Sequence, residues 1–444
     1  MTDLLIQNAR MVNEGREFSG DLRIKGDRID AIAPYLFAKH GEKVLNANGR
    51  LLLPGVIDAQ VHFREPGMEH KGNLVTEPAA AVAGGVTSFL DMPNTKPPAL
   101  DAATLEDKYR RAAGRSRANY GFYFGASNDN LEEIRRIDPK KTPGLKIFMG
   151  ASTGNMLVDD PQVLEGMFAD CPTPIITHCE DTPMIEAELA KARAIYGEDI
   201  PVDLHGEIRS RAACIKSTEL AISMAKRFDS SLHVLHISTA DELALFQPGP
   251  IMHKRITAET CVHFLHFARE DYARLGNLIK CNPAIKEASD RAALLRAIAE
   301  DRIDVLATDH APHTWDEKQQ KYEKAPSGLP LVQFFLACAM QKVRDGHFSL
   351  PHLVRKICHA PAQRFSIAER GYLREGYYAD LVLVEPTGGT TVTREKILSK
   401  CGWSPFEGER FDARVAATFV NGELAWNGEQ LVGAPQGRRL AFGR

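Results

Sequence analysis

Short apolar runs, each close to polar residues at its end, recur through the middle of the chain and constrain its fold more than any other feature. The runs lie near eight positions: Val56, Val86, Tyr120, Leu145, Ile175, Leu232, Leu278 and Val305. Most are separated by segments with helical periodicity, such as residues 102–113 and 217–228. Strands that alternate with helices are typical of a parallel α/β fold, and eight such units predict a (β/α)8 barrel.

Polar residues that could take part in catalysis or ligand binding lie at or near the ends of these runs. They are His62, Arg64, Asp91 to Thr95, Lys146, His178, His236, Asn282 and Asp309. In a (β/α)8 barrel the carboxyl ends of all strands meet at one mouth, where the catalytic residues of this fold lie. We therefore expect these side chains to form a single site.

The two ends of the chain have a different pattern. Residues 1–53 and 372–444 contain short strand-like runs with tight turns, including a hairpin predicted at Gly26-Asp27. Neither end is long enough to make a β-sandwich by itself. Together they predict a small β-sandwich domain, with a barrel domain of residues 54–371 inserted between its two parts.

The composition excludes several classes of protein. The 444 residues are 44% hydrophobic and 25% charged, with a formal net charge of −3 and no long basic block, so we expect no nucleic-acid partner. The eight cysteines are dispersed without a CxxC pair, which favours free thiols in a reducing cytoplasm. A signal-peptide pattern is missing from the N-terminal residues, and the most apolar window, residues 328–340, is too short to cross a bilayer. We predict a cytoplasmic protein without a membrane partner.

Several of the strand-end residues are candidate metal ligands. Imidazole and carboxylate groups suit zinc, and the candidates are His62, His178, His236 and Asp309. Asp309 can also accept a proton from an attacking water and return it to a leaving nitrogen. Other histidines, such as His205 and His233, are expected to be structural, as is His310, which is one residue out of strand phase.

Lys146 lies inside the apolar run 144–148, where an unpaired ammonium group is costly to bury. Two interpretations remain open. In one, a nearby carboxylate pairs with the lysine. In the other, burial lowers its pKa, the neutral amine takes up carbon dioxide, and the resulting carbamate bridges two metal ions.

Motifs along nearly the whole chain resemble those of dihydroorotases, which are cyclic amidohydrolases of the amidohydrolase superfamily. The motifs are Pro54-Gly55-Val56-Ile57-Asp58, His62-Phe63-Arg64-Glu65-Pro66-Gly67, Ala83-Gly84-Gly85-Val86-Thr87, Asp91-Met92-Pro93-Asn94-Thr95, Thr177-His178-Cys179-Glu180, His236-Ile237-Ser238-Thr239, Lys280-Cys281-Asn282-Pro283 and Thr308-Asp309-His310-Ala311-Pro312-His313. The resemblance implies two zinc ions bridged by carboxylated Lys146. His62 and Asp309 would hold the first ion, and His178 and His236 would hold the second.

The resemblance also implies a substrate site, in which Arg64 and Asn94 bind the substrate carboxylate. The ring carbonyls and carboxylate would further contact Asn282, His313 and the backbone around Ser327 and Gly328. The implied reaction is the reversible cyclisation of N-carbamoyl-L-aspartate to dihydroorotate in pyrimidine biosynthesis. Arg64 is the discriminating residue, because hydantoin and dihydropyrimidine rings carry no carboxylate for an arginine fork.

Alternatives to this interpretation remain. Arg64 would have no substrate role if it paired internally with Glu65 or Asp58. An allantoinase or a hydantoinase is the rival enzyme, although the segment Met92-Pro93-Asn94-Thr95 favours dihydroorotase over allantoinase by resemblance.

One position departs from the family pattern: Gln60-Val61-His62 stands where the family has His-x-His. A glutamine amide is a poorer zinc ligand than imidazole. His62, the Lys146 carbamate and Asp309 still supply three protein ligands, which is sufficient for a tetrahedral catalytic zinc.

Loss of metal histidines is the hallmark of inactive dihydroorotase-like partners of aspartate transcarbamoylase. Because only one ligand is altered here, we expect an active enzyme, with such a non-catalytic partner as the alternative. We also expect a small-molecule substrate and a homo-oligomer, most simply a dimer, with aspartate transcarbamoylase as a candidate associate.

Overall fold

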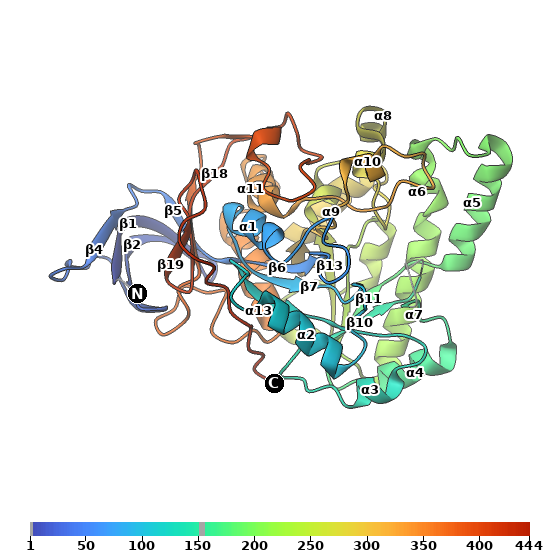
Figure 1. Ribbon diagram of the computed structural model, residues 1–444, viewed down its shortest axis with the longest axis horizontal. Helices are drawn as coiled ribbons and strands as arrows, with labels where there is room; N and C mark the ends of the chain where they lie inside the picture. Colours follow the sequence, from blue (N-terminus) through green and yellow to red (C-terminus); the bar gives the residue numbers. More distant parts are fainter. Residues whose placement is uncertain (1–2, 151–155) are drawn as a thin grey trace.

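Parallel strands form the centre of the protein (Figure 1). The computed structural model describes residues 3–150 and 156–444, so Met1 and Thr2 of the predicted N-terminal segment lie outside it. One sheet has the order β6-β7-β8 and another the order β14-β13-β12-β11-β10-β9. The strands are β6 Val56–Val61, β7 Val86–Asp91, β8 Asn119–Phe122, β9 Phe124–Gly125, β10 Leu145–Phe148, β11 Ile175–His178, β12 Leu232–Val234, β13 Ile256–Cys261 and β14 Val305–Ala307. Val61 also bridges His310 in parallel, so β6 lies beside the segment that follows β14.

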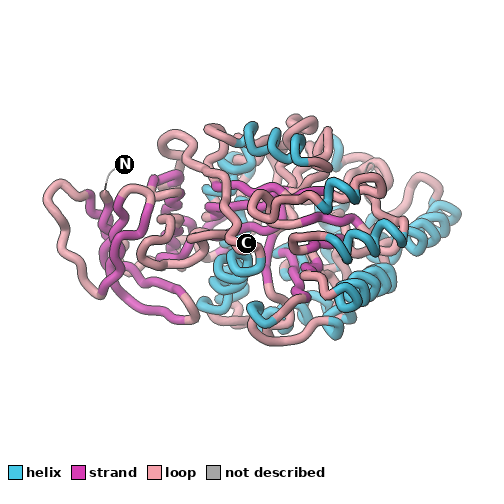
Figure 2. Tube along the Cα trace, turned by 90° about the horizontal axis from the view of Figure 1, so that it is seen from below, coloured by secondary structure: helices cyan, strands magenta, loops and turns pink. Residues whose placement is uncertain are grey.

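Helices connect successive parallel strands and lie around them (Figure 2). The longer ones are α1 Thr76–Ala83, α2 Ala102–Ala112, α4 Pro161–Asp170, α5 Thr182–Tyr196, α7 Arg211–Phe228, α9 Ala288–Ala299 and α11 Phe335–Arg344. The shorter ones are α3 Leu131–Arg135, α6 His205–Ile208, α8 Tyr272–Leu275, α10 Trp315–Lys318, α12 Leu350–Val354 and α13 Ala360–Arg364. The helices predicted over residues 102–113 and 217–228 are confirmed. The second begins earlier than predicted, because the Ser210 side chain accepts a hydrogen bond from the Ala213 N–H and caps α7.

The strand predicted near Leu278 is wrong. Residues Gly276–Ile279 form a 3₁₀ helix, and the strand at this place in the order is β13. Gly276 has a φ of 54°, a left-handed conformation that starts a turn rather than a strand. The strand β13 was not predicted because it carries polar side chains such as Thr257 and Glu259, both fully buried, which interrupt the apolar pattern.

Both ends of the chain build one further sheet, on the left of Figure 1. Its order is β19-β18-β15-β5-β1-β2-β3, with β4 paired to β1. The strands are β1 Leu4–Asn13, β2 Arg16–Lys25, β3 Arg28–Ala33, β4 Lys43–Asn46, β5 Leu51–Pro54, β15 Leu381–Glu385, β18 Arg414–Val420 and β19 Glu423–Trp426. The hairpin predicted at Gly26-Asp27 joins β2 to β3. A separate short pair joins β16 Thr390–Thr391 to β17 Arg410–Phe411. That the two ends form a β-sandwich domain stays a prediction.

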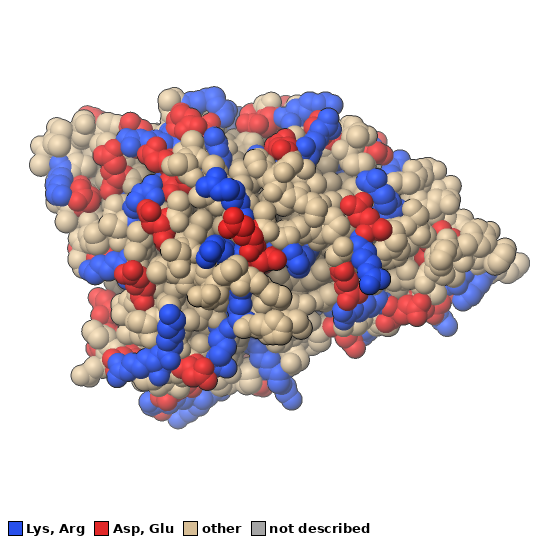
Figure 3. Space-filling view, turned by 180° about the vertical axis from the view of Figure 1, so that it is seen from behind, with Lys and Arg blue, Asp and Glu red and all other residues tan. Residues whose placement is uncertain are grey.

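Charges of both signs lie interspersed on the face shown in Figure 3. All eight cysteines are among the described residues, and each carries a free thiol. Within the described residues, the helices are all too short or too polar to cross a membrane.

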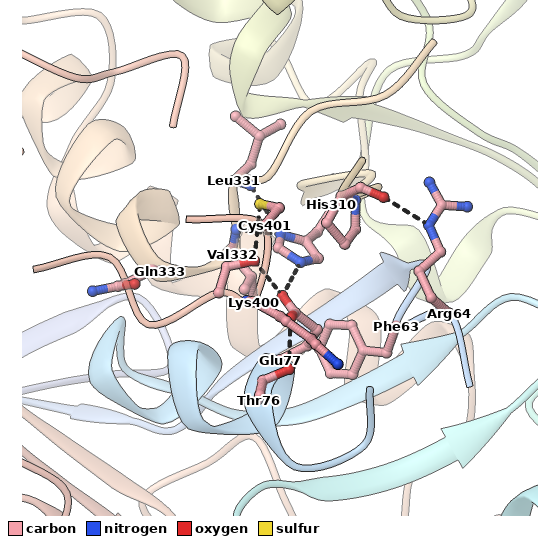
Figure 4. Close-up of polar contacts among 12 residues, drawn as sticks. Phe63, Arg64, Thr76, Glu77, His310, Leu331, Val332, Gln333, Lys400 and Cys401 are labelled. Atoms are coloured by element: carbon pink, nitrogen blue, oxygen red, sulfur yellow. Dashed lines mark hydrogen bonds and ion pairs between the residues drawn. The ribbon is translucent and has the colours of Figure 1, made fainter. Parts of the chain in front are cut away.

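The buried carboxylate of Glu77 ties three distant segments together (Figure 4). It lies near the start of α1 and accepts hydrogen bonds from Ser399 Oγ at 2.5 Å, the Lys400 N–H at 3.0 Å and Thr76 Oγ1 at 2.9 Å. His310 Nε2 lies 2.8 Å from the same carboxylate. His310 is therefore structural, as predicted, and it links the segment after β14 to the C-terminal part of the chain.

Glu77→Ala is expected to lower the free energy of unfolding by about 3–5 kcal/mol, because it leaves the buried partners of the carboxylate unpaired. Denaturant unfolding would measure the change. The control Glu300→Ala removes a carboxylate whose side chain is 59% exposed, and it should change stability by less than about 0.5 kcal/mol. Equal stability of the two variants would contradict the anchoring role of Glu77.

Candidate active site

A cavity of about 360 Å³ lies at the carboxyl ends of the parallel strands. Every predicted site residue lines it: His62, Arg64, Asn94, Lys146, His178, His236, Asn282, Asp309, His313, Ser327 and Gly328. Arg64, His236 and Asp309 have φ angles of 73°, 39° and 52°. Left-handed backbone is uncommon at residues other than glycine and gathers at functional sites. The convergence predicted from strand ends is therefore present, while the role of each residue stays a prediction.

His62 faces Asp309 on one side of the cavity. Its Nδ1 lies 2.8 Å from the amide oxygen of Asn94, and because that oxygen only accepts, Nδ1 carries the proton. When Nδ1 alone carries a proton, Nε2 is an acceptor, and it lies 3.1 Å from Asp309 Oδ1. Two acceptors at this distance need a proton or a cation between them. Burial would raise the pKa of Asp309, but His62, His263 and Lys146 outweigh it and hold that pKa below its usual value.

His178 and His236 form a second pair, with His178 Nδ1 2.9 Å from His236 Nε2. The other nitrogen of His178, Nε2, donates to Glu180 at 2.9 Å, and Glu180 is held in turn by the Arg209 guanidinium. Burial disfavours the ionised form of Glu180, but Arg209 and His178 outweigh it and lower the pKa of Glu180. A carboxylate that accepts from one imidazole nitrogen directs the other nitrogen towards a metal. His236 Nδ1 is buried without a hydrogen-bond partner in the described part of the chain.

Lys146 is 1% exposed and forms no ion pair with any described residue. Its Nζ lies 4.5 Å from the centre of the Phe148 ring. Burial lowers the pKa of Lys146 to about 7, although Asp309 opposes the shift. The alternative in which a carboxylate pairs with Lys146 is therefore wrong for the described residues. A large fraction of its amine is neutral at neutral pH.

The donor set fits divalent metal ions such as zinc. Among residues 3–150 and 156–444, no three His, Cys, Asp or Glu side chains form a complete set of ligands by themselves. The donors form two pairs instead, and the charge of Lys146 acts on His178 and His236 as well as on Asp309. A cation at each pair would account for the close approach of His62 to Asp309 and for that of His178 to His236.

Arg64 lies in the cavity wall and is 7% exposed. Its Nε donates to the Pro312 carbonyl at 3.0 Å, and its Nη2 lies 3.0 Å from His313 Nε2. Figure 4 shows its side chain pointing away from Glu77. Burial lowers the pKa of Arg64 to about 10, so the group is still protonated at neutral pH.

The internal pairing considered for Arg64 is wrong. Glu65 instead accepts from Arg115 Nη1 at 2.6 Å, and Asp58 accepts from Thr308 Oγ1 at 2.6 Å. Among the described residues, Arg64 has no carboxylate within ion-pair distance. Its charge is therefore available to a ligand in the cavity.

His313 lies among several cations. Lys71 Nζ donates to His313 Nδ1 at 3.0 Å, and His313 Nε2 lies 3.0 Å from both the Ser327 carbonyl oxygen and Arg64 Nη2. Burial, together with the charges of Arg64, Lys71 and Lys318, lowers the pKa of His313 well below its usual value. The positive charges on this side of the cavity favour an anionic substrate.

Asn282 and Gly328 complete this wall. Asn282 Oδ1 is buried and has no hydrogen-bond partner among the described residues. The Gly328 N–H donates to the Lys280 carbonyl at 2.9 Å, so this N–H is already engaged within the protein. Gly328 has a φ of 145°, and a Cβ there would lie 2.5 Å from the Ala311 carbonyl oxygen. Only glycine fits this position.

Sequence reasoning missed several residues around the cavity. Glu180 stands two residues after His178, in strand phase, and that spacing was a usable signal. Arg209 lies in the cavity wall and carried no signal in the sequence. His205 also lines the cavity, but its nitrogens contact the Tyr322 hydroxyl at 2.8 Å and the Cys281 carbonyl at 2.7 Å, which agrees with the predicted structural role.

The fold is shared with solved cyclic-amide hydrolases. L-Hydantoinase (dihydropyrimidinase) from Arthrobacter aurescens aligns with a TM-score of 0.93 at 26% identity, covering 99% of this chain and 100% of that one. Dihydropyrimidinase from Brevibacillus agri aligns with a TM-score of 0.90 at 25% identity, covering both chains completely. The fold and the donor set together define a metal-dependent cyclic amidohydrolase.

Residues 51–425 match the amidohydrolase family, and the chain belongs to that family. Similar relatives include a dihydroorotase from Halobacterium salinarum, 32% identical over 95% of this chain and 96% of the relative. A dihydroorotase from Methanosarcina acetivorans is 30% identical over 99% of this chain and 95% of the relative. An allantoinase from Bacillus velezensis is 31% identical over 96% of this chain and 94% of the relative.

Proposed function

We propose that the protein is a dihydroorotase, which interconverts N-carbamoyl-L-aspartate and dihydroorotate in pyrimidine biosynthesis. The observation that carries the proposal is Arg64, a buried and protonated guanidinium in the cavity wall with no carboxylate partner among the described residues. Dihydroorotate and N-carbamoyl-L-aspartate carry a carboxylate for this group, whereas hydantoin does not.

The proposal includes two zinc ions: His62 and Asp309 would hold one, His178 and His236 would hold the other, and carboxylated Lys146 would supply a ligand to both. Zinc, when bound, supplies Lewis-acid activation of water and of the amide carbonyl. Asp309 accepts the proton of the attacking water and returns it to the departing ring nitrogen.

The substrate is held by the opposite wall of the cavity. Arg64 and Asn94 bind the carboxylate and so fix the reacting carbonyl in place. Asn94 has its Nδ2 for this purpose, because its oxygen is engaged by His62. Asn282, His313 and Ser327 contact the ring carbonyls and carboxylate, and Gly328 shapes the wall behind them.

Architecture and assembly belong to the same proposal. The parallel strands of residues 54–371 close as a (β/α)8 barrel, which the contact between β6 and the segment after β14 supports. Residues 1–53 and 372–444 form the β-sandwich domain. We propose a cytoplasmic homodimer, with aspartate transcarbamoylase as the candidate associate.

The deciding experiment is dihydroorotate hydrolysis by zinc-loaded protein, followed by ultraviolet absorbance, with a chelated sample as control. Allantoin and hydantoin are tested in parallel, because an allantoinase is as similar to this chain as the dihydroorotases are. Chelator-sensitive turnover of dihydroorotate alone supports the proposal. Turnover of allantoin alone reassigns the substrate, and no turnover by folded, metal-loaded protein favours the non-catalytic partner.

Arg64→Met is expected to raise KM for dihydroorotate roughly 10- to 100-fold, the value of one or two lost charge-assisted hydrogen bonds. Steady-state kinetics over a range of substrate concentrations would measure it. The control Arg111→Met removes an exposed arginine that pairs with Asp107, and it should leave KM unchanged. An unchanged KM in Arg64→Met would exclude the carboxylate contact.

A further inference from the structure

Gln60 occupies a fixed position beside Asp309. It is the penultimate residue of β6, is 1% exposed and lies in the cavity wall. Its backbone N–H donates to Asp58 Oδ1 at 3.3 Å. Val61 and His310 form a parallel bridge, which sets the register of the two segments. In this register Gln60 and Asp309, each one residue earlier, lie opposite one another.

The contacts of the Gln60 side chain determine which way its amide points. Nε2 donates to Asp309 Oδ1 at 2.9 Å, and Oε1 accepts from Cys261 Sγ at 3.8 Å. Reversing the amide would remove the hydrogen bond to Asp309 and would turn Nε2 towards the Cys261 thiol. The carbonyl oxygen, the one atom of this side chain suited to binding a cation, therefore points to Cys261 on β13.

We infer that Gln60 is a positioning residue that holds Asp309 through its amide and donates no metal ligand. The two metal positions are consequently unequal. The position at His178 and His236 has two imidazoles, backed by Glu180, whereas the position at His62 and Asp309 has one imidazole. The inference rests on the metal centre of the proposed function but not on the identity of the substrate. It predicts that the position at His62 and Asp309 binds zinc more weakly than the position at His178 and His236.

His263 is the other imidazole near Asp309. It lies in the 3₁₀ helix Val262–Leu265 that follows β13, close enough to Asp309 for the charge of each group to shift the pKa of the other. Both of its ring nitrogens are buried without a hydrogen-bond partner in the described part of the chain. It does not line the cavity, so it acts on Asp309 from outside the cavity wall. If His263 supplied the imidazole that Gln60 lacks, the two metal positions would not differ in the way inferred here.

The test is a titration of metal-free full-length protein with zinc against a competing chelator, read without substrate. The native chain should show two affinities that differ roughly tenfold or more, and Gln60→His should tighten the weaker one by roughly 10- to 100-fold. Gln60→Leu should retain both metal positions, with the weaker one loosened by no more than roughly tenfold, while lowering kcat, because Asp309 loses its hydrogen-bond donor. Gln162→His, at an exposed position, is the matched control and should change neither affinity.

Three results would overturn the inference. The first is equal affinities in the native chain. The second is loss of the weaker site in Gln60→Leu, which would make Gln60 a ligand. The third is loss of that site in folded His263→Gln, which would make His263 the ligand. Because zinc binding is read without substrate, a failed dihydroorotate assay would leave this result unaffected.

Discussion

Asp309→Asn is expected to lower turnover of dihydroorotate roughly 10³- to 10⁴-fold, at the upper end of what a general acid–base group contributes. Asparagine has nearly the same shape as aspartate but neither takes up the proton of the attacking water nor offers an anionic oxygen. The native carboxylate is held ionised, since its pKa lies below the usual value despite burial. Turnover at saturating substrate measures the loss.

Circular dichroism and thermal unfolding of the same variant should match the native protein, because Gln60 and His62 still have an oxygen to contact at position 309. Asp316→Asn, at an exposed position of α10, is the matched control and should keep native turnover. Retention of more than about a tenth of native turnover in Asp309→Asn would exclude the proton-transfer role.

Lys146→Met is expected to reduce bound zinc and to lower turnover roughly 10³-fold, since metal activation supplies several kcal/mol of transition-state stabilisation. Methionine fills the same buried space beside Phe148 without an amine. Zinc content by elemental analysis and turnover would both be measured. The control Lys141→Met changes a lysine whose side chain is 61% exposed and should have neither effect.

The role of the Lys146 amine has its own readout. Only a neutral amine attacks carbon dioxide, and raising the pH through about 7 converts the ammonium to the amine. Activation of metal-free native protein by zinc should therefore depend on bicarbonate and should become faster between pH 6 and pH 8. Activation that is independent of bicarbonate at every pH would exclude the carbamate.

Local sequence pattern predicted most of the strands and helices, because side-chain periodicity reports which face of an element is buried. It failed at β13, where the inward-facing side chains include Thr257 and Glu259. His233 lies 2.8 Å from Thr257 Oγ1 and 3.3 Å from Glu259, so these polar groups have partners inside the protein. The interior near the site is polar, and a strand that faces it does not look apolar.

The sequence by itself determined which strand-end residues meet at the cavity, since the carboxyl ends of parallel strands meet whatever the details of packing, but it did not place Arg209 or His205 there. Only the tertiary structure decided what those residues contact. It paired Glu65 with Arg115, so that Arg64 forms no ion pair with a carboxylate among the described residues. It also left Lys146 without an ion pair in the same part of the chain and turned the amide of Gln60 towards Asp309. Residue type and strand phase are local properties, whereas a charge or hydrogen-bond partner comes from a segment up to hundreds of residues away and depends on how the elements pack.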